Sequence, residues 1–165
     1  MLYLQRSRQL AVAALAFDLN HTIVYPETRL AVPGAIDFLE AVSEQGLGIA
    51  LVTDSTAFVV DELLKAVGLS RKKFALVHSS GAYSTEERKG KNSRTWADAL
   101  RMLGVKPENI LVVDNSPASV AVAKATGMLV AGITTTNSPD SLRAAGATLV
   151  SDHYSELAEE LGILL

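Results

Sequence analysis

The sequence lacks cysteine entirely, and it also lacks any apolar run long enough to cross a membrane. Without cysteine there is no disulfide scaffold, no iron–sulfur site and no thiol nucleophile. The composition fits a reducing compartment, so we expect a cytoplasmic protein. The apolar run at residues 10–17 is shorter than the roughly 18 residues of a membrane helix. It leads into Asp18 rather than a small-residue cleavage site, which favours a buried strand over a signal peptide.

An excess of one charge sign is also missing. The net charge is only −3, whereas a nucleic-acid-binding face needs clustered lysine and arginine, so nucleic acid is not an expected partner. Hydrophobic residues make up 48% of the chain and charged residues 20%, a balance that supports a folded core. We interpret residues 1–165 as a single domain that includes an N-terminal extension at residues 1–10.

Short apolar runs alternate with stretches of helical periodicity. Six runs predict strands buried on both faces of a parallel sheet: residues 12–17, 47–52, 74–77, 110–113, 129–133 and 147–150. Helical spacing predicts helices near residues 35–42, 60–67, 96–103, 116–127, 138–146 and 155–161. The alternation predicts a three-layer, Rossmann-like α/β sandwich, with the strand at 12–17 central between those at 47–52 and 110–113.

Polar residues follow three of the predicted strands. Asp18 comes after the first strand, Thr53 after the second and Asp114 after the fourth, while Lys91 lies in the loop before the third helix. Ligands of parallel sheets bind at the carboxyl ends of the strands, so these side chains are candidates for one crevice. Carboxylates can attack phosphorus or hold Mg²⁺, and a hydroxyl and an ammonium can neutralise phosphoryl oxygens. Each residue alone could instead cap a helix or loop, an alternative that is weaker for all four together.

Four segments resemble the motifs of the haloacid dehalogenase (HAD) superfamily. Motif I corresponds to residues 17–22 (Phe-Asp-Leu-Asn-His-Thr), motif II to 51–55 (Leu-Val-Thr-Asp-Ser), motif III to Lys91 and motif IV to 111–117 (Leu-Val-Val-Asp-Asn-Ser-Pro). Their order, spacing and residue types agree, and the resemblance covers residues 11–161. The stretch that begins at Lys91 is similar to the β-phosphoglucomutase-like branch.

The resemblance implies a Mg²⁺-dependent phosphatase. By this resemblance Asp18 is the nucleophile that forms an aspartyl-phosphate, and Thr53 and Lys91 hold the phosphoryl group. The carboxylates of Asp18 and Asp114, with the backbone carbonyl of Asn20, would coordinate the Mg²⁺ cofactor.

Three positions depart from the family pattern. The motif I general acid/base is Asn20 here, the glycine that follows it is His21, and the second motif IV aspartate is Asn115. An amide cannot act as a general acid or base near neutral pH, and such catalysis usually contributes about 10²–10⁴-fold. His21 could donate a proton, although a histidine in a loop is more often simply solvated. Asp54, a candidate for substrate binding, is expected to cap the helix that begins near Thr56.

Relatives in this branch carry a helical cap after motif I. Here residues 23–32 leave room only for a β-hairpin flap with its turn near Pro26, and the second insertion point, residues 79–90, is a short polar loop. The resemblance therefore implies a cap-less, open site. Such a site suits a phosphorylated small molecule or macromolecule, or a second copy or partner subunit that supplies a lid.

Two functions remain open. One is a weak or specialised phosphatase, and the other is a degenerate HAD domain that binds phosphate, metal or a partner without turnover. The survival of Asp18, Thr53, Lys91 and Asp114 favours the enzyme. A dinucleotide-binding domain would need a glycine-rich turn after the first strand, where this sequence has Asp-Leu-Asn-His. A phospho-acceptor receiver domain would carry its aspartate after the third strand, whereas Asp18 follows the first. Both classes are therefore set aside.

Overall fold

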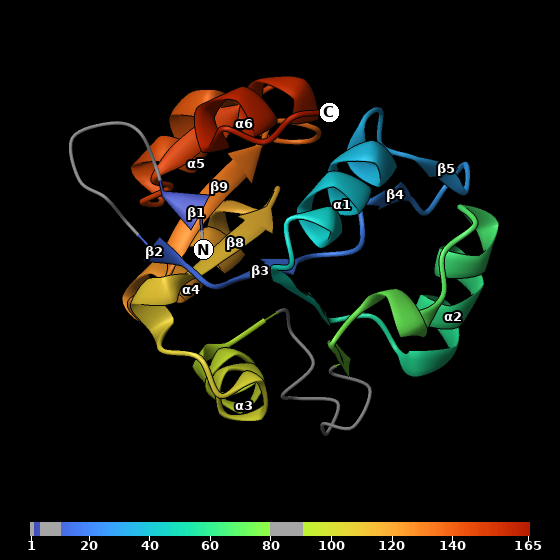
Figure 1. The fold of residues 1–165 in the computed structure, drawn as a ribbon, viewed down its shortest axis with the longest axis horizontal. Coiled ribbons are helices and arrows are strands. Elements are labelled where there is room, and N and C mark those ends of the chain that lie inside the picture. Colours follow the sequence, from blue (N-terminus) through green and yellow to red (C-terminus); the bar gives the residue numbers. More distant parts are fainter. Residues whose placement is uncertain (1, 4–10, 80–90) are drawn as a thin grey trace.

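The computed structural model describes residues 2–3, 11–79 and 91–165 and shows a three-layer α/β sandwich (Figure 1). Its centre is a six-stranded parallel sheet in the order β10-β9-β8-β3-β6-β7. The fold class is the one predicted, and β3 lies between β6 and β8 as expected. The strands of this sheet are β3 (Ala14–Phe17), β6 (Gly48–Thr53), β7 (Leu76–Ser79), β8 (Ile110–Asp114), β9 (Leu129–Ile133) and β10 (Leu149–Ser151).

The central strands are apolar throughout because helices cover both faces of the sheet. Every residue of β3, β8 and β9 is buried. Leu15 and Leu111, paired in register, belong to one core cluster, whereas the next pair, Ala16 and Val112, belongs to the other. Successive side chains of a strand point to opposite faces, so both faces need apolar residues.

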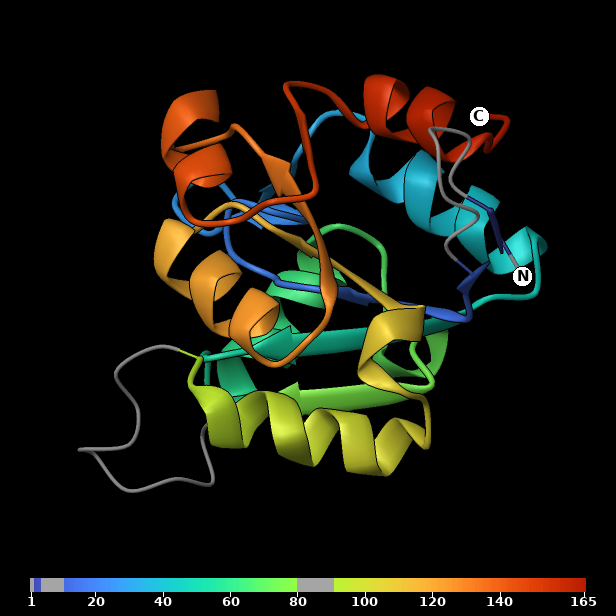
Figure 2. The ribbon, with the colours of Figure 1, turned by 90° about the vertical axis from the view of Figure 1, so that its left-hand side faces the viewer.

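Helices form the outer two layers. Those seen in the described residues are α1 (Ala35–Glu44), α2 (Ala57–Ala66), α3 (Ser93–Leu103), α4 (Pro117–Ala125), α5 (Pro139–Ala144) and α6 (Tyr154–Leu161). One core cluster packs α1, α2 and α6 against the sheet, and the second packs α3, α4 and α5 against the opposite face. Figure 2 shows α4 and α5 (orange) separated from α1 (cyan) and α6 (red) by the strands.

The start of α3 fixes the backbone that follows Lys91. Asn92 is the N-cap: its side chain accepts a hydrogen bond from the Thr95 N–H at 3.0 Å, and the Thr95 hydroxyl accepts one from the Asn92 N–H at 3.3 Å. This reciprocal capping box satisfies two backbone donors at the helix terminus. Trp96, in the first turn, is 1% exposed, and its indole Nε1 has no hydrogen-bond partner among the residues that the structure describes.

Several strand boundaries differ from the prediction. The run at residues 12–17 is not one strand: β2 (Ala11–Val12) pairs antiparallel with β1 (Leu2–Tyr3), and β3 begins at Ala14. Ala13 separates them, because its N–H donates to the Asn109 carbonyl at 2.8 Å and its carbonyl accepts from the Gly48 N–H at 3.4 Å. β6, β7 and β10 begin one or two residues later than predicted. Residues 4–10 of the predicted extension lie outside the described residues.

A short hairpin follows motif I. β4 (Val24–Tyr25) pairs antiparallel with β5 (Leu30–Ala31). In the turn, the Arg29 guanidinium (Nη1) lies 3.8 Å from Oε2 of Glu62 in α2. Of the second insertion point, only Ser79 falls within the described residues. No helix in the described ranges is long and apolar enough to span a membrane.

Candidate active site

Asp18 and Asp114 lie at the carboxyl ends of two neighbouring strands. Phe17 and Val113 are paired in register in β3 and β8, and the Asp18 N–H donates to the Val113 carbonyl at 3.0 Å. Asp114 is the last residue of β8. Strand order reverses at β3, with β6 and β7 on one side and β8 to β10 on the other. The carboxylates therefore lie at the switch point where open α/β sheets bind ligands.

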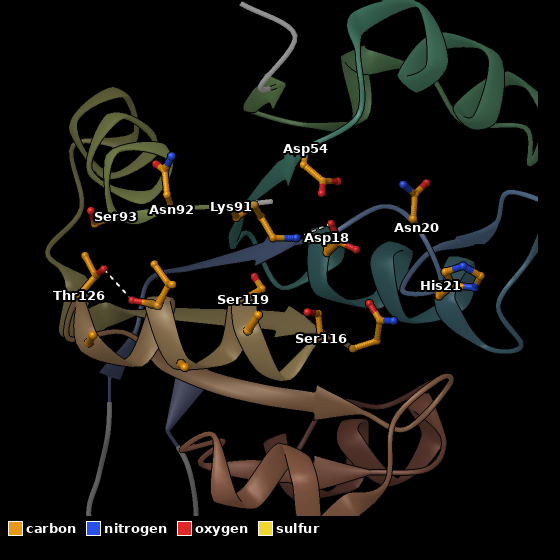
Figure 3. Close-up of a pocket in the computed structure, with 15 residues that line it drawn as sticks. Asp18, Asn20, His21, Asp54, Lys91, Asn92, Ser93, Ser116, Ser119 and Thr126 are labelled. Atoms are coloured by element: carbon orange, nitrogen blue, oxygen red, sulfur yellow. Dashed lines mark hydrogen bonds and ion pairs between the residues drawn. The ribbon is translucent and has the colours of Figure 1, made fainter. Parts of the chain in front are cut away.

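The ammonium of Lys91 lies between these two carboxylates. Its Nζ is 2.5 Å from Asp18 Oδ1 and 2.9 Å from Asp114 Oδ2. The Lys91, Asp18 and Asp114 side chains are 5%, 6% and 0% exposed. Figure 3 shows Lys91 extended toward Asp18 from the segment that precedes α3. Asp18, Lys91 and Asp114 thus form one buried ion cluster. They are three of the four residues that the sequence predicted for one crevice.

Asp114 is fixed by the start of α4. Its Oδ1 accepts a hydrogen bond from the Ser116 N–H at 2.9 Å, and its Oδ2 accepts one from the Ser119 hydroxyl at 2.6 Å. With the Lys91 contact, both carboxylate oxygens have partners from the protein itself. Asp18 Oδ2, by comparison, faces the Thr22 hydroxyl at the longer distance of 3.4 Å. Asp114 is therefore the more rigidly held of the two carboxylates.

Burial dominates the electrostatics of the cluster. It raises the pKa of Asp18 to about 6, against the lowering effect of the Lys91 ammonium and with a further rise from the Asp114 charge. Burial alone would lower the pKa of Lys91, but the charges of Asp114 and Asp18 outweigh it, so that pKa is raised and the ammonium stays protonated. When Asp18 is ionised, two carboxylates face one ammonium. One negative charge of the cluster is then uncompensated within the described part of the chain.

Thr53 and Asp54 follow β6 on the other side of β3. Thr53 is fully buried, and its hydroxyl oxygen accepts a hydrogen bond from the Ser55 N–H at 3.1 Å. Asp54 is exposed and lines the cavity in front of the ion cluster (Figure 3). The expectation that Asp54 caps α2 was wrong, because Thr56 is the N-cap and accepts from the Val59 N–H at 3.5 Å. A capping side chain must lie directly before the helix to reach its third N–H, and Asp54 lies two residues too early.

The side chain of Asn20 is oriented by Ser55. Asn20 Nδ2 donates to Ser55 Oγ at 2.9 Å, and Asn20 Oδ1 is buried without a hydrogen-bond partner in the described residues. Asn20 also lines the cavity. An amide offers a donor and an acceptor, but it does not ionise near neutral pH and cannot act as a general acid or base. At the position where the HAD motif has an acid/base, this protein therefore has an amide whose oxygen can only accept a hydrogen bond.

His21 stands where the HAD motif has a glycine, and its backbone adopts a conformation that favours glycine. Its φ of +58° lies in the left-handed region that favours glycine. Its N–H donates to the Val24 carbonyl at 2.7 Å, and its carbonyl accepts from the Thr135 hydroxyl at 2.5 Å. The imidazole Nε2 lies 3.1 Å from Glu27 of the hairpin, and His21 lines the cavity. The histidine side chain therefore connects the cavity wall to the hairpin.

Contacts from the C-terminal half hold motif I, and the sequence did not predict them. The Tyr154 hydroxyl donates to the Thr22 carbonyl at 2.8 Å, and the Thr22 hydroxyl donates to Asn115 Oδ1 at 3.2 Å. Asn115 Nδ2 donates in turn to the Thr136 hydroxyl at 2.6 Å. No local pattern marks Tyr154 or Thr136, because their partners are distant in sequence. Asn115 thus links motif I to the loop after β9 through neutral hydrogen bonds.

A cavity of about 840 Å³ lies in front of these residues. Asp18, Asn20 and Lys91 form part of its wall, which continues along α4 as far as Thr126. Ala118, Ala121, Val122 and Ala125 are the small apolar residues of that wall. The cavity therefore has room for an organic group attached to a phosphate.

The donor set fits Mg²⁺. Asp18 and Asp114 would supply the carboxylate ligands, and within residues 2–3, 11–79 and 91–165 no group of three histidine or acidic side chains could hold a metal ion. Mg²⁺ commonly binds through one or two carboxylates and keeps several waters. The uncompensated negative charge of the cluster favours a cation, and the carbonyl of Asn20 would add an oxygen. A cation between the carboxylates would compete with the Lys91 ammonium for the same position.

Comparisons with known proteins identify the family. The family model for haloacid dehalogenase-like hydrolases matches residues 3–127, and the protein belongs to this family. The crystal structure of CbbY from Rhodobacter sphaeroides in complex with phosphate has a TM-score of 0.78 at 16% identity, covering 92% of this chain and 100% of that chain. This similarity establishes the shared fold.

Two curated relatives match most of the chain. The phosphoglycolate phosphatase of Rhodospirillum rubrum is 30% identical over 151 residues, which are 91% of this chain and 61% of the relative. The protein SUPPRESSOR OF QUENCHING 1, chloroplastic, of Arabidopsis thaliana is 28% identical over 133 residues, which are 81% of this chain and 12% of the relative. The chain therefore spans less than two thirds of the length of either relative.

Proposed function

We propose that the protein is a Mg²⁺-dependent phosphohydrolase that acts through an aspartyl-phosphate on Asp18. The observation that carries the proposal is the buried cluster in which Lys91 joins Asp18 to Asp114 at the carboxyl end of the sheet. Membership of the haloacid dehalogenase-like hydrolases supports it, as does similarity to a phosphoglycolate phosphatase. The substrate class is a phosphoric monoester.

The proposed chemistry has two steps. In the first, an oxygen of Asp18 forms a bond to phosphorus, the ester P–O bond breaks, and the leaving oxygen departs with the bonding electrons. In the second, water attacks the same phosphorus and loses a proton to solvent, the bonding electrons return to the Asp18 carboxylate as its bond to phosphorus breaks, and inorganic phosphate leaves. Lys91 and the Thr53 hydroxyl would neutralise charge on the phosphoryl oxygens. Bound Mg²⁺, held by Asp18, Asp114 and the Asn20 carbonyl, would supply further charge stabilisation.

Asn20 restricts the proposed reaction. Asn20 cannot give the leaving oxygen its proton, because an amide is not a general acid and this one donates to Ser55. Leaving groups that are stable as anions do not need that proton in the transition state. Aryl and acyl phosphates are therefore the expected substrates, and alkyl phosphates the poor ones.

The departures at Asn20 and Asn115 also favour a second candidate function. Both side chains make neutral hydrogen bonds within the fold, to Ser55 and to Thr136. A domain that binds phosphate or a partner without turnover would tolerate both amides. This non-catalytic domain is the alternative that the following experiment must separate from the enzyme.

The test is a Mg²⁺-dependent assay on paired aryl and alkyl phosphates, with wild type, Asn20→Asp and Asp18→Asn. We expect hydrolysis of the aryl ester by wild type, loss in Asp18→Asn, and a gain in Asn20→Asp of up to about 10²–10⁴-fold, largest for the alkyl ester. Asn20→Asp in the Asp18→Asn background is the matched control and should be inactive. If folded wild type and Asn20→Asp both match that control, the enzyme proposal fails and the binding domain stands.

A further inference from the structure

Lys91 is a counter-ion built into the candidate cation site. Its ammonium contacts Asp18 Oδ1 at 2.5 Å and Asp114 Oδ2 at 2.9 Å, and its side chain is almost completely buried. A divalent cation that binds the same two oxygens, Asp18 Oδ1 and Asp114 Oδ2, needs the space and the lone pairs that this ammonium uses. The two cations therefore exclude each other at this position.

The charge of the cluster makes the binding of Mg²⁺ and the binding of phosphate depend on each other. With two carboxylates and one ammonium the net charge is −1 once Asp18 is ionised, so a phosphate dianion that enters alone meets a repulsive site. Mg²⁺ alone would bring the cluster to +1 and would leave the displaced ammonium beside it. With both ligands bound the total returns to −1, and the ammonium gains phosphate oxygens as partners.

The Lys91 ammonium can move while the start of α3 stays in place. The capping box of Asn92 and Thr95 fixes the backbone directly after Lys91. The four-carbon side chain of lysine carries a compact charge on several rotatable bonds. The cavity that Lys91 lines also contains Asp18, so a phosphoryl group at Asp18 lies within the space that the ammonium can reach.

We infer that Lys91 couples Mg²⁺ binding to phosphate binding by moving from its position between Asp18 and Asp114 to the oxygens of the bound phosphate. The inference rests on the proposed function, because it assumes that both ligands bind at this cluster. Coupling of this kind is reciprocal: phosphate strengthens Mg²⁺ binding by the factor by which Mg²⁺ strengthens phosphate binding. We expect a factor of about 5 to 150, the usual range for coupled sites.

The experiment measures the Kd of Mg²⁺ by calorimetry with and without inorganic phosphate, after subtraction of the heat of Mg²⁺ binding to phosphate in buffer. In wild type, phosphate should tighten Mg²⁺ binding. In Lys91→Met, Mg²⁺ alone should bind more tightly than in wild type, and the effect of phosphate should be smaller. Lys106→Met is the matched control, because Lys106 is exposed and directly precedes η3 (Pro107–Asn109), at the end of β8 opposite Asp114. It should behave as wild type.

A second measurement does not depend on the folding of Lys91→Met. In crystals of wild type with Mg²⁺ and phosphate, Lys91 Nζ should have left Asp114 and should contact the phosphate. Equal coupling in wild type and Lys91→Met, absence of Mg²⁺ binding, or an ammonium that stays between the carboxylates would each overturn the inference. Hydrolysis without coupling rejects the coupling alone, whereas coupling without hydrolysis rejects only the hydrolase proposal.

Discussion

The buried carboxyl of Asp18 should make the stability of the protein depend on pH. Burial raises its pKa from 3.8 to about 6, so the folded protein binds this proton more tightly than the unfolded chain does. The stability contributed by this group is therefore greatest below about pH 4 and is lost as the pH rises through about 4 to 6. A shift of about two pKa units corresponds to at most about 3 kcal/mol in the free energy of unfolding.

Removal of this charge should remove that pH dependence. We expect Asp18→Asn to gain stability relative to wild type between about pH 4 and pH 7, by up to about 3 kcal/mol, when urea unfolding is measured across this range. Lys91 then pairs with Asp114 alone. Asp140→Asn, whose carboxylate is 98% exposed, is the control and should show a far smaller pH-dependent change. A stability difference for Asp18→Asn that stays constant with pH would contradict the raised pKa.

Among the individual residues of the site, the sequence predicts the charged ones better than the neutral ones. Asp18 and Asp114 directly follow apolar runs, and adjacent parallel strands must bring their ends together. The orientation of Asn20 could not be predicted, because it depends on a hydrogen bond to Ser55 across 35 residues of chain. The Tyr154 hydroxyl that supports Thr22 is likewise visible only once α6 is packed in place.

Among the structural elements, the turn at His21 gives a direct test of backbone strain. Its φ of +58° suits glycine and costs an L-residue with a Cβ atom roughly 1–2 kcal/mol. We therefore expect His21→Gly to be more stable than His21→Ala by about 1 kcal/mol, measured by thermal or urea unfolding. Both variants lose the imidazole and its contact with Glu27, so the comparison isolates the backbone.

The control for this comparison lies on an exposed helical position. Ala97 is exposed within α3, and Ala97→Gly should lower stability by about 1 kcal/mol, the opposite order of alanine and glycine. If His21→Ala proves as stable as His21→Gly, the turn does not hold the left-handed conformation in solution.

Element type and order could be predicted, whereas several boundaries could not. Continuous apolar runs identify strands because both faces of this sheet are covered, and helical spacing identifies the helices between them. The break at Ala13 could not be predicted, because it arises from hydrogen bonds to Asn109 and Gly48 and not from any change in the apolar run. The choice of Thr56 over Asp54 as the cap of α2 depends on the path of the chain after β6.

For the molecule as a whole, the hairpin between motif I and α1 leads to a prediction about substrate size. Residues 19–34 hold only β4, β5 and their turns. We expect phenyl phosphate and a phosphotyrosine peptide, which share an aryl leaving oxygen, to be hydrolysed with comparable kcat/KM. A steady-state assay on the two substrates checks this, and a strong preference for phenyl phosphate would point to a lid that closes over the site.

The burial of Trp96 has a practical consequence. It is the only tryptophan of the chain, and it lies in the first turn of α3, with three residues between it and the N-cap Asn92. Selective excitation of tryptophan therefore reports on one known position, five residues after Lys91 in the sequence, without any added dye. An indole shielded from water emits at shorter wavelength than an exposed one, so a change in its emission maximum on addition of Mg²⁺ or phosphate would follow this part of the molecule in real time.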